Sequence, residues 1–245
     1  MKKSFIVIIA LVLLAAIGWF YFRSDSQSPP GTGQLEGQIF NKQRLSLTDP
    51  SSLWVIANKH RPLQPKTYTP SDLVVPDVPL RLTAKDDEMK LRREAAGALR
   101  ALFAEAEQKG LKLMVSSAYR SYSFQTGLYN RYVQQQGQAT ADTQSARPGF
   151  SEHQTGLAVD VEPASRTCEV EACFGDTPEG QWVAANAYKY GFIIRYQEGE
   201  QDTTGYVYEP WHLRYVGQDL SQELYQQGNP TLEDFFGLEP ASDYQ

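Results

Sequence analysis

An apolar run near the amino terminus sets one part of this chain apart from a globular fold. No charged residue occurs between Lys3 and Arg23, and the run from Phe5 to Phe22 is close to the lower length limit for spanning a bilayer. Its aromatic end suits a membrane interface better than a signal-peptide cleavage site. We therefore expect residues 1–23 to be one uncleaved transmembrane segment in contact with the lipid bilayer.

The charges next to this segment predict its orientation. Lys2 and Lys3 belong on the cytoplasmic side, so the rest of the chain is expected outside the cytoplasm, anchored by the segment. Small residues such as Ala16 and Ser24 leave cleavage, and hence secretion, open. The absence of a cysteine near the segment argues against lipoprotein attachment.

The composition then indicates a tether followed by one domain. Residues 24–50 begin with Ser, Pro, Gly and Gln, which predicts a flexible tether. Residues 51–225 are numerous enough for one domain with a full core, and 226–245 are left as a C-terminal tail that either forms a short helix or docks elsewhere. The net charge of −6 without a basic cluster argues against a nucleic-acid partner, and nothing in the sequence indicates the oligomeric state.

Periodicity in the domain indicates an α+β fold, because strands and helices are segregated instead of alternating strictly. The predicted helices have capping residues or apolar stripes, and the predicted strands are short apolar runs. Helices are expected at 83–109, 121–136 and 177–191. Thr83 and Asp86 resemble a capping pair at the start of the first helix, whose apolar stripe consists of Met89, Ala95, Ala96, Leu99, Leu102, Phe103 and Ala106. In the second helix, Phe124, Leu128, Tyr132 and Val133 are expected to face the core. Strands are expected at 111–120, 157–161, 191–196 and 205–216, and loops at 137–149 and 197–205.

The cysteines predict a local crosslink. The chain has only two, Cys168 and Cys173, in a segment that resembles a loop. A zinc-binding pair usually has two or three intervening residues and further partners, whereas an exported chain favours oxidation. A disulfide is therefore the better interpretation, with two free thiols as the alternative.

Asp160 interrupts the apolar strand at 157–161, and a carboxylate buried there needs a compensating partner. An arginine could be that partner. Two of the three histidines of the chain, His153 and His212, are further candidates. Two imidazoles and one carboxylate would give zinc three protein ligands and leave a fourth position for water, as a catalytic site requires.

Glu209 stands three residues before His212, and the intervening Pro210 favours an extended or turn conformation over a helix. A bend there would bring the carboxylate to the same pocket, where a group that is not a ligand can move a proton from the activated water. Strand alternation directs His212 and Trp211 to opposite faces, which assigns Trp211 to packing.

Several ordered motifs carry a resemblance to a known family. The stretch 151–160 fits the pattern S-x-H-x-x-G-x-A-x-D, the stretch 209–212 fits E-x-W-H, and 117–125 fits S-x-Y-R-S-x-x-x-Q. A further stretch, "NKHRPL" at 58–63, is similar to the family's Asn-Lys-x-x-Pro-Leu segment. The chain thus resembles the LAS group of zinc peptidases, named for lysostaphin, D-Ala-D-Ala metallopeptidases and Sonic hedgehog, and within it the VanY-type D-alanyl-D-alanine carboxypeptidases.

The resemblance implies a small, mainly antiparallel central sheet flanked by helices and a single zinc ion. It implies that the zinc is held by His153, Asp160 and His212, with Glu209 as the catalytic base. It also implies that Arg120 polarises the scissile carbonyl or holds the substrate carboxylate. The substrate contacts implied by the motifs are Ser117, Tyr119, Arg120, Gln125 and Ser151.

The expected activity is removal of the terminal D-Ala from peptidoglycan stem peptides at the outer face of a bacterial cytoplasmic membrane. The first expectation is a D,D-carboxypeptidase, and the second is an L,D-carboxypeptidase acting on tetrapeptide stems. A non-catalytic, zinc-stabilised wall-binding module is a further alternative, although the intact Glu209 argues against it. Neither the S-x-x-K motif of serine enzymes nor H-E-x-x-H is present.

Overall fold

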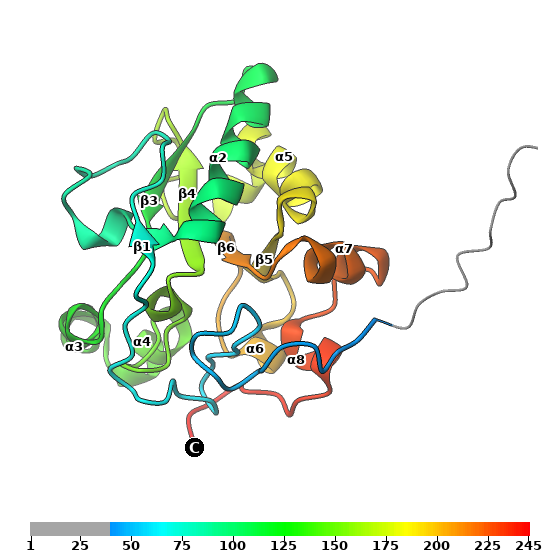
Figure 1. Cartoon of the computed structure of the whole chain (residues 1–245). Coiled ribbons are helices and arrows are strands. Elements are labelled where there is room, and N and C mark those ends of the chain that lie inside the picture. The colour runs from blue at the N-terminus through cyan, green and yellow to red at the C-terminus, as the bar shows by residue number, and fades with distance from the viewer. Residues whose placement is uncertain (1–39) are drawn as a thin grey trace, which may run out of the picture. The chain divides into compact units, whose positions relative to one another are not determined.

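The computed structural model describes residues 40–245, and residues 41–245 form one compact unit (Figure 1). The predicted membrane segment, 1–23, lies outside the described residues. Among residues 40–245, none of the helices has the length and apolar character needed to cross a bilayer. The compact unit takes in residues 41–50, which composition alone assigned to the tether.

A four-stranded sheet with the order β3-β4-β6-β5 forms the centre, and every neighbouring pair is antiparallel. Its strands are β3 (Leu113–Ser117), β4 (Ala158–Pro163), β5 (Phe192–Tyr196) and β6 (Glu209–Tyr215). A separate antiparallel pair joins β1 (Leu73–Val74) to β2 (Leu91–Arg92). The antiparallel sheet confirms the predicted α+β class.

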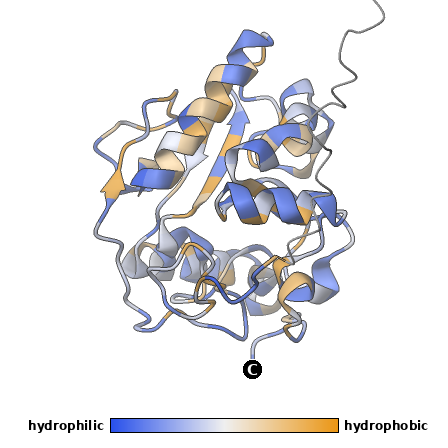
Figure 2. Cartoon of the chain, turned by 45° about the vertical axis from the view of Figure 1, so that its right-hand side comes forward, coloured by the Kyte–Doolittle hydropathy of each residue, from blue (hydrophilic) through white to orange (hydrophobic). Residues whose placement is uncertain are grey.

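Helices surround the sheet, and their ribbons carry both hydrophobic and hydrophilic residues (Figure 2). The α-helices are α2 (Arg93–Gln108), α3 (Tyr122–Gln136), α4 (Gln138–Gln144), α5 (Pro178–Asn186), α6 (Gln201–Thr204), α7 (Gln218–Gln226) and α8 (Leu232–Phe236). Short 3-10 helices are η1 (Asp87–Met89), η2 (Glu152–Thr155), η3 (Ala172–Asp176) and η4 (Ala187–Tyr190). Helix α2 contacts β3, α5 contacts β4 and β6, and α7 contacts β5.

The two central strands, β4 and β6, are buried along their whole length. Alternation places Val159 and Val161 of β4 with Leu213 of β6 in the hydrophobic core, together with the apolar stripe of α2. The opposite face therefore receives the polar residues of the same strands, among them Asp160 and His212. The buried centre of the sheet thus carries Asp160 and His212 on the face opposite to the hydrophobic core.

The first predicted helix begins later than expected, at Arg93 instead of Thr83. The capping-type pair closes a separate turn, since the Thr83 backbone N–H and hydroxyl both donate to Asp86. The following residues are drawn into extended pairing, because Arg92 N donates to the carbonyl oxygen of Gly156 and pairs with Leu73. Tertiary hydrogen bonds override the helix-forming composition of this stretch.

Other predicted elements match or are refined. Helix α3 begins as expected after Ser121, whose hydroxyl accepts from Phe124 N, but its most buried residues are Gln125 and Tyr129, not the predicted apolar stripe. The predicted loop 137–149 contains α4, and the acidic loop 197–205 contains α6.

The last twenty residues pack onto the domain through α8. Glu233 of α8 is fully buried and bonds to Asn58 and Arg195. Beyond it, the carbonyl of Ser242 accepts a hydrogen bond from Lys59 Nζ. The carboxyl-terminal segment thus packs against the "NKHRPL" stretch through hydrogen bonds to Asn58 and Lys59.

Candidate active site

Two neighbouring strands and one short turn bring the predicted ligands together. Asp160 on β4 and His212 on β6 are direct partners in the antiparallel ladder, so their side chains lie on the same face. His153 lies on η2, and the chain turns from η2 into β4 at Gly156 with φ 68°. A Cβ at Gly156 would lie 2.9 Å from Leu73 Cδ2, which explains the need for glycine at this turn.

The distances between the three side chains fit one tetrahedral zinc ion. Asp160 Oδ1 lies 3.4 Å from His153 Nε2 and 3.3 Å from His212 Nδ1, yet this buried oxygen has no hydrogen-bond partner in the part of the chain described. Ligand atoms about 2.0–2.1 Å from a tetrahedral zinc stand about 3.3–3.4 Å apart. The three candidate ligand atoms all lie within 4.8 Å of one another. The donor set therefore fits the metal that the motifs imply.

The remaining imidazole nitrogens are held on the outer side. His153 Nδ1 lies 2.5 Å from the carbonyl oxygen of Ala118, which can only accept, so this nitrogen carries the proton. His212 Nε2 lies 3.4 Å from Glu152 Oε2. These outer contacts leave the other nitrogen of each ring directed toward Asp160. Metal-binding histidines are oriented in the same way by hydrogen bonds from their outer nitrogen.

Arg120 is tied to the ligand carboxylate. Its Nη2 lies 2.6 Å from Asp160 Oδ2, and its Nε donates to Ser117 Oγ at 3.0 Å. Burial alone would raise the pKa of Asp160, but the charges of His153 and Arg120 beside it hold the pKa well below its usual range. The carboxylate is therefore ionised at any working pH.

The second carboxylate of the site has different electrostatics. Glu209 is 8% exposed, and its Oε2 lies 3.6 Å from His212 Nδ1. Burial raises the pKa of Glu209 to about 7, with Asp160 adding to the rise and the charge of His212 opposing it. A carboxylate with this pKa can both take and return a proton near neutral pH.

The pKa values of the two imidazoles are shifted in opposite directions. Burial lowers the pKa of His153 to about 4, and the nearby Arg120 adds to this decrease. Burial also disfavours the charged form of His212, but Asp160 and Glu152 outweigh it and raise its pKa to about 9. In the absence of a metal, the site therefore favours a positive charge beside Asp160.

These groups lie at the base of a cleft of about 520 Å³. Helix α3 contributes Leu128 and Tyr132 to the wall, which accounts for the half-buried apolar residues of that helix. Further lining residues come from the segments 144–146 and 206–209. Side chains from several separate parts of the chain therefore shape the cleft.

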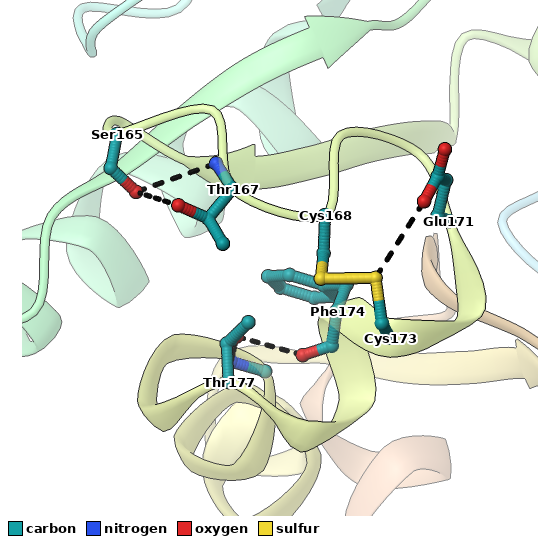
Figure 3. The surroundings of a disulfide bond; sticks show 8 residues. Ser165, Thr167, Cys168, Glu171, Cys173, Phe174 and Thr177 are labelled. Atoms are coloured by element: carbon teal, nitrogen blue, oxygen red, sulfur yellow. Dashed lines mark hydrogen bonds between the residues drawn. A yellow bond between two sulfur atoms is a disulfide. The ribbon is translucent and has the colours of Figure 1, made fainter.

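A disulfide between Cys168 and Cys173 closes the loop that forms one wall of this cleft, which confirms the predicted crosslink (Figure 3). Val170, Glu171 and Ala172 of this loop line the cleft. Val170 has φ 52°, a left-handed conformation that is unusual for a β-branched residue. The crosslinked loop thus holds a strained backbone against the substrate space.

Of the five substrate contacts that the motifs imply, two line the cleft and three do not. Arg120 and Ser151 line the cleft. Ser117 bonds to Arg120 instead, and the hydroxyl of Tyr119 bonds to Thr69. Gln125 is fully buried and donates to Ser145 Oγ and to the carbonyl of Ala146. Ser117, Tyr119 and Gln125 therefore support the cleft from behind and do not line it.

Sequence reasoning missed the residues that surround His212. Glu152 occupies a variable position of the S-x-H motif, and Arg195 and Arg214 lie in strands with no distinguishing signal. Tyr196 lines the cleft with its ring centroid 4.8 Å from that of His212. Trp211 lies mainly in the core, as expected, and also reaches the cleft wall.

An antiparallel α+β fold in which Asp160 and His212 of the central strands meet His153 of η2, with the Glu209 carboxylate beside them, is typical of a zinc-type metallopeptidase. A comparison with known families agrees, since the description "VanY: D-alanyl-D-alanine carboxypeptidase" matches residues 88–218. The chain belongs to the VanY family of carboxypeptidases, as the sequence motifs indicated.

Individual relatives cover most of the chain. The putative carboxypeptidase YodJ of Bacillus subtilis (strain 168) is 42% identical over 207 residues, which are 82% of this chain and 75% of that protein. The solved LdcB LD-carboxypeptidase is 44% identical with a TM-score of 0.72, covering 77% of this chain and 87% of that one. A variant of the vancomycin resistance D,D-pentapeptidase VanY, solved in complex with Zn(II), is 28% identical with a TM-score of 0.61, covering 76% and 99%.

Proposed function

We propose that the chain is a zinc-dependent carboxypeptidase that removes the terminal D-Ala from peptidoglycan stem peptides. The observation that carries this proposal is the unsatisfied Asp160 Oδ1, which faces His153 Nε2 and His212 Nδ1 at distances suited to zinc. Family membership and the Zn(II) complex of the VanY relative support the same metal. In this proposal His153, Asp160 and His212 are the ligands.

The site residues divide the reaction between them. Bound zinc lowers the pKa of a coordinated water to about 7 and polarises a carbonyl oxygen. Glu209 accepts the proton released as the water oxygen bonds to the carbonyl carbon. It then delivers that proton to the amide nitrogen as the C–N bond breaks, and D-Ala leaves with a neutral amine. The pKa of Glu209, raised to about 7 by burial, supports both transfers.

Arg120 is the proposed electrostatic partner of the substrate. Its side chain is 18% exposed at the cleft while it is ion-paired with Asp160. A guanidinium keeps its charge at any working pH, so it can stabilise a developing oxyanion or a substrate carboxylate at close range. Ser151 also lines the cleft and is the remaining proposed contact.

The bond that is cleaved has two candidates. The family description favours a D,D-carboxypeptidase acting on D-Ala-D-Ala ends. The higher identity to the LD-carboxypeptidase LdcB, 44% against 28% for the D,D-pentapeptidase, favours the L,D bond of tetrapeptide stems. We place the L,D activity first on this ground, which reverses the order given by the motifs alone.

Mass spectrometry of purified stem peptides after incubation with the protein tests both activities. Loss of one alanine from the tetrapeptide supports the L,D-carboxypeptidase, and loss of one alanine from the pentapeptide supports the D,D-carboxypeptidase. Cleavage of neither peptide by the zinc-loaded protein would favour the wall-binding module over an enzyme.

We further propose that the enzyme acts on the outer face of a bacterial cytoplasmic membrane, anchored by residues 1–23. The disulfide supports an oxidising compartment. The apolar run at 5–22 and the lysines before it support an anchor with this orientation. Protease treatment of intact cells tests this: the domain should be digested from outside and should sediment with membranes beforehand.

A further inference from the structure

Glu152 is next to His153 in the sequence, but its side chain contacts the other histidine of the site. Its Oε2 lies 3.4 Å from His212 Nε2. The Glu152 side chain is completely buried. A buried carboxylate is costly unless several charged or hydrogen-bonding groups compensate it, so its partners define what it does.

Two arginines hold the other oxygen of this carboxylate. Arg195 Nε and Arg214 Nη1 both donate to Glu152 Oε1 at 2.9 Å. Both arginine side chains are completely buried. Because Oε1 is occupied by these two guanidinium groups, Oε2 is directed at the imidazole of His212.

The arginines are fixed in turn by separate parts of the domain. Arg195 forms a two-bond ion pair with Glu233 of α8, with distances of 2.6 and 2.9 Å. Arg214 Nη2 donates to the carbonyl oxygens of Leu53 and Val55, at 2.9 and 2.7 Å. The carboxylate of Glu152 therefore sits in a rigid frame built from both ends of the domain.

We propose that Glu152 is a positioning residue that holds the proton of His212 on Nε2 and thereby aims Nδ1 at the metal. This inference rests on the proposed role of His212 as a zinc ligand. An ionised carboxylate only accepts hydrogen bonds, so Nε2 must be the donor and the lone pair of Nδ1 is left for the cation. The same contact fixes the rotation of the ring, which a ligand bond alone does not.

The chain offers a matched pair of variants to test this role. Glu152→Gln and Glu233→Gln each remove one buried carboxylate that faces Arg195. Of these two glutamates, Glu152 contacts His212 and Glu233 does not. The affinity for zinc is measured by competition with a chromophoric chelator, and the ligand geometry is measured from the visible spectrum of the protein loaded with Co(II). Thermal unfolding of each metal-free variant reports the structural cost separately.

We expect Glu152→Gln to weaken zinc binding by about 10- to 100-fold and to alter the Co(II) spectrum. Glu233→Gln should lower the unfolding temperature while leaving both metal readouts at the wild-type values. Equal zinc affinity and an unchanged spectrum in Glu152→Gln, or equal losses in the two variants, would overturn the inference.

A second variant covers the case in which Glu152→Gln does not fold. Glu152→Asp keeps the charge facing the arginines but withdraws the carboxylate from His212. We expect it to weaken zinc binding and to alter the Co(II) spectrum, and wild-type values of both would overturn the inference. The metal readouts also separate this inference from the proposed function. A wild-type protein that binds zinc but cleaves no stem peptide refutes the proposed function alone, whereas a wild-type protein that binds no zinc refutes both.

Discussion

Asp160 and His212 face each other across neighbouring antiparallel strands, and Asp160 Oδ1 lies 3.3 Å from His212 Nδ1. This pair ends the β4–β6 ladder, in which the preceding pair Val159 and Leu213 keeps the two strands in register. Two of the candidate ligands therefore come from paired strands, and His153 is supplied by a turn.

Removal of zinc should abolish hydrolysis and lower the unfolding temperature. Zinc binds the folded site and not the unfolded chain, so it contributes about 2.7 kcal/mol at a free concentration one hundred times its dissociation constant. Activity and thermal melts before and after chelation, followed by zinc titration, measure both effects. The variant Asp160→Asn serves as the control, since its melt should not respond to zinc. Hydrolysis that survives thorough chelation would refute the metal mechanism.

Glu209→Gln should retain zinc and lose turnover by about 10²- to 10⁴-fold, because the carboxylate is assigned proton transfer and not ligation. Steady-state kinetics and zinc content of the purified variant are measured together. In the comparison variant His212→Ala, both zinc and activity should be lost. Loss of zinc from Glu209→Gln would instead make Glu209 a ligand.

Acid should destabilise the domain partly through Glu233. Burial alone would raise its pKa, but Arg195 and Asn58 hold the pKa below the ordinary value of 4.5. A lowered pKa means that the stabilisation is fully present above pH 4.5 and is lost as the pH falls toward the folded-state value. Glu233→Gln should therefore flatten the fall in the free energy of unfolding below this pH.

Urea unfolding at a series of acidic pH values gives these slopes. Glu107, which is exposed on α2, provides the matched control, and Glu107→Gln should keep the wild-type slope. An unchanged slope in Glu233→Gln would contradict the assignment of this carboxylate to acid stability.

Replacement of both Cys168 and Cys173 by serine should raise KM more than it lowers kcat. The crosslinked loop lines the cleft but carries none of the proposed metal ligands. Loss of a short crosslink also lowers the free energy of unfolding by about 2 kcal/mol. Kinetics of the oxidised protein, the reduced protein and the double variant test this. A reductant should have no effect on the double variant, and an unchanged KM in all three would exclude the loop from substrate binding.

The sequence allowed the metal site to be predicted because its chemistry is local. Asp160 in an apolar strand required a partner, and His153 and His212 stood in short motifs with restricted spacing. The structure brings these three residues together. The apolar stripe of α2 was likewise correct, since Ala95, Leu99 and the other expected positions are buried.

The errors arose where distant parts of the chain decide the conformation. The start of α2 depends on hydrogen bonds that residues 88–92 form with Gly156 and with the segment after β3, where Ala118 N and Tyr119 N are the donors, and no local pattern shows these bonds. Glu152 was missed because its role depends on Arg195 and Arg214, both far along the chain. Gln125 was expected at the substrate, but a polar side chain on a helix gives no sign of whether it turns inward.

The ion pair between Arg120 and Asp160 has a consequence for coordination. With Oδ2 engaged by the guanidinium at 2.6 Å, Oδ1 is the oxygen that faces the two imidazoles. If Asp160 held an ion through Oδ1 alone, the protein would supply three donor atoms, one from each of His153, Asp160 and His212. Arg120, which lies outside that set, would then favour binding through a single oxygen and leave room at the ion for both water and a substrate carbonyl.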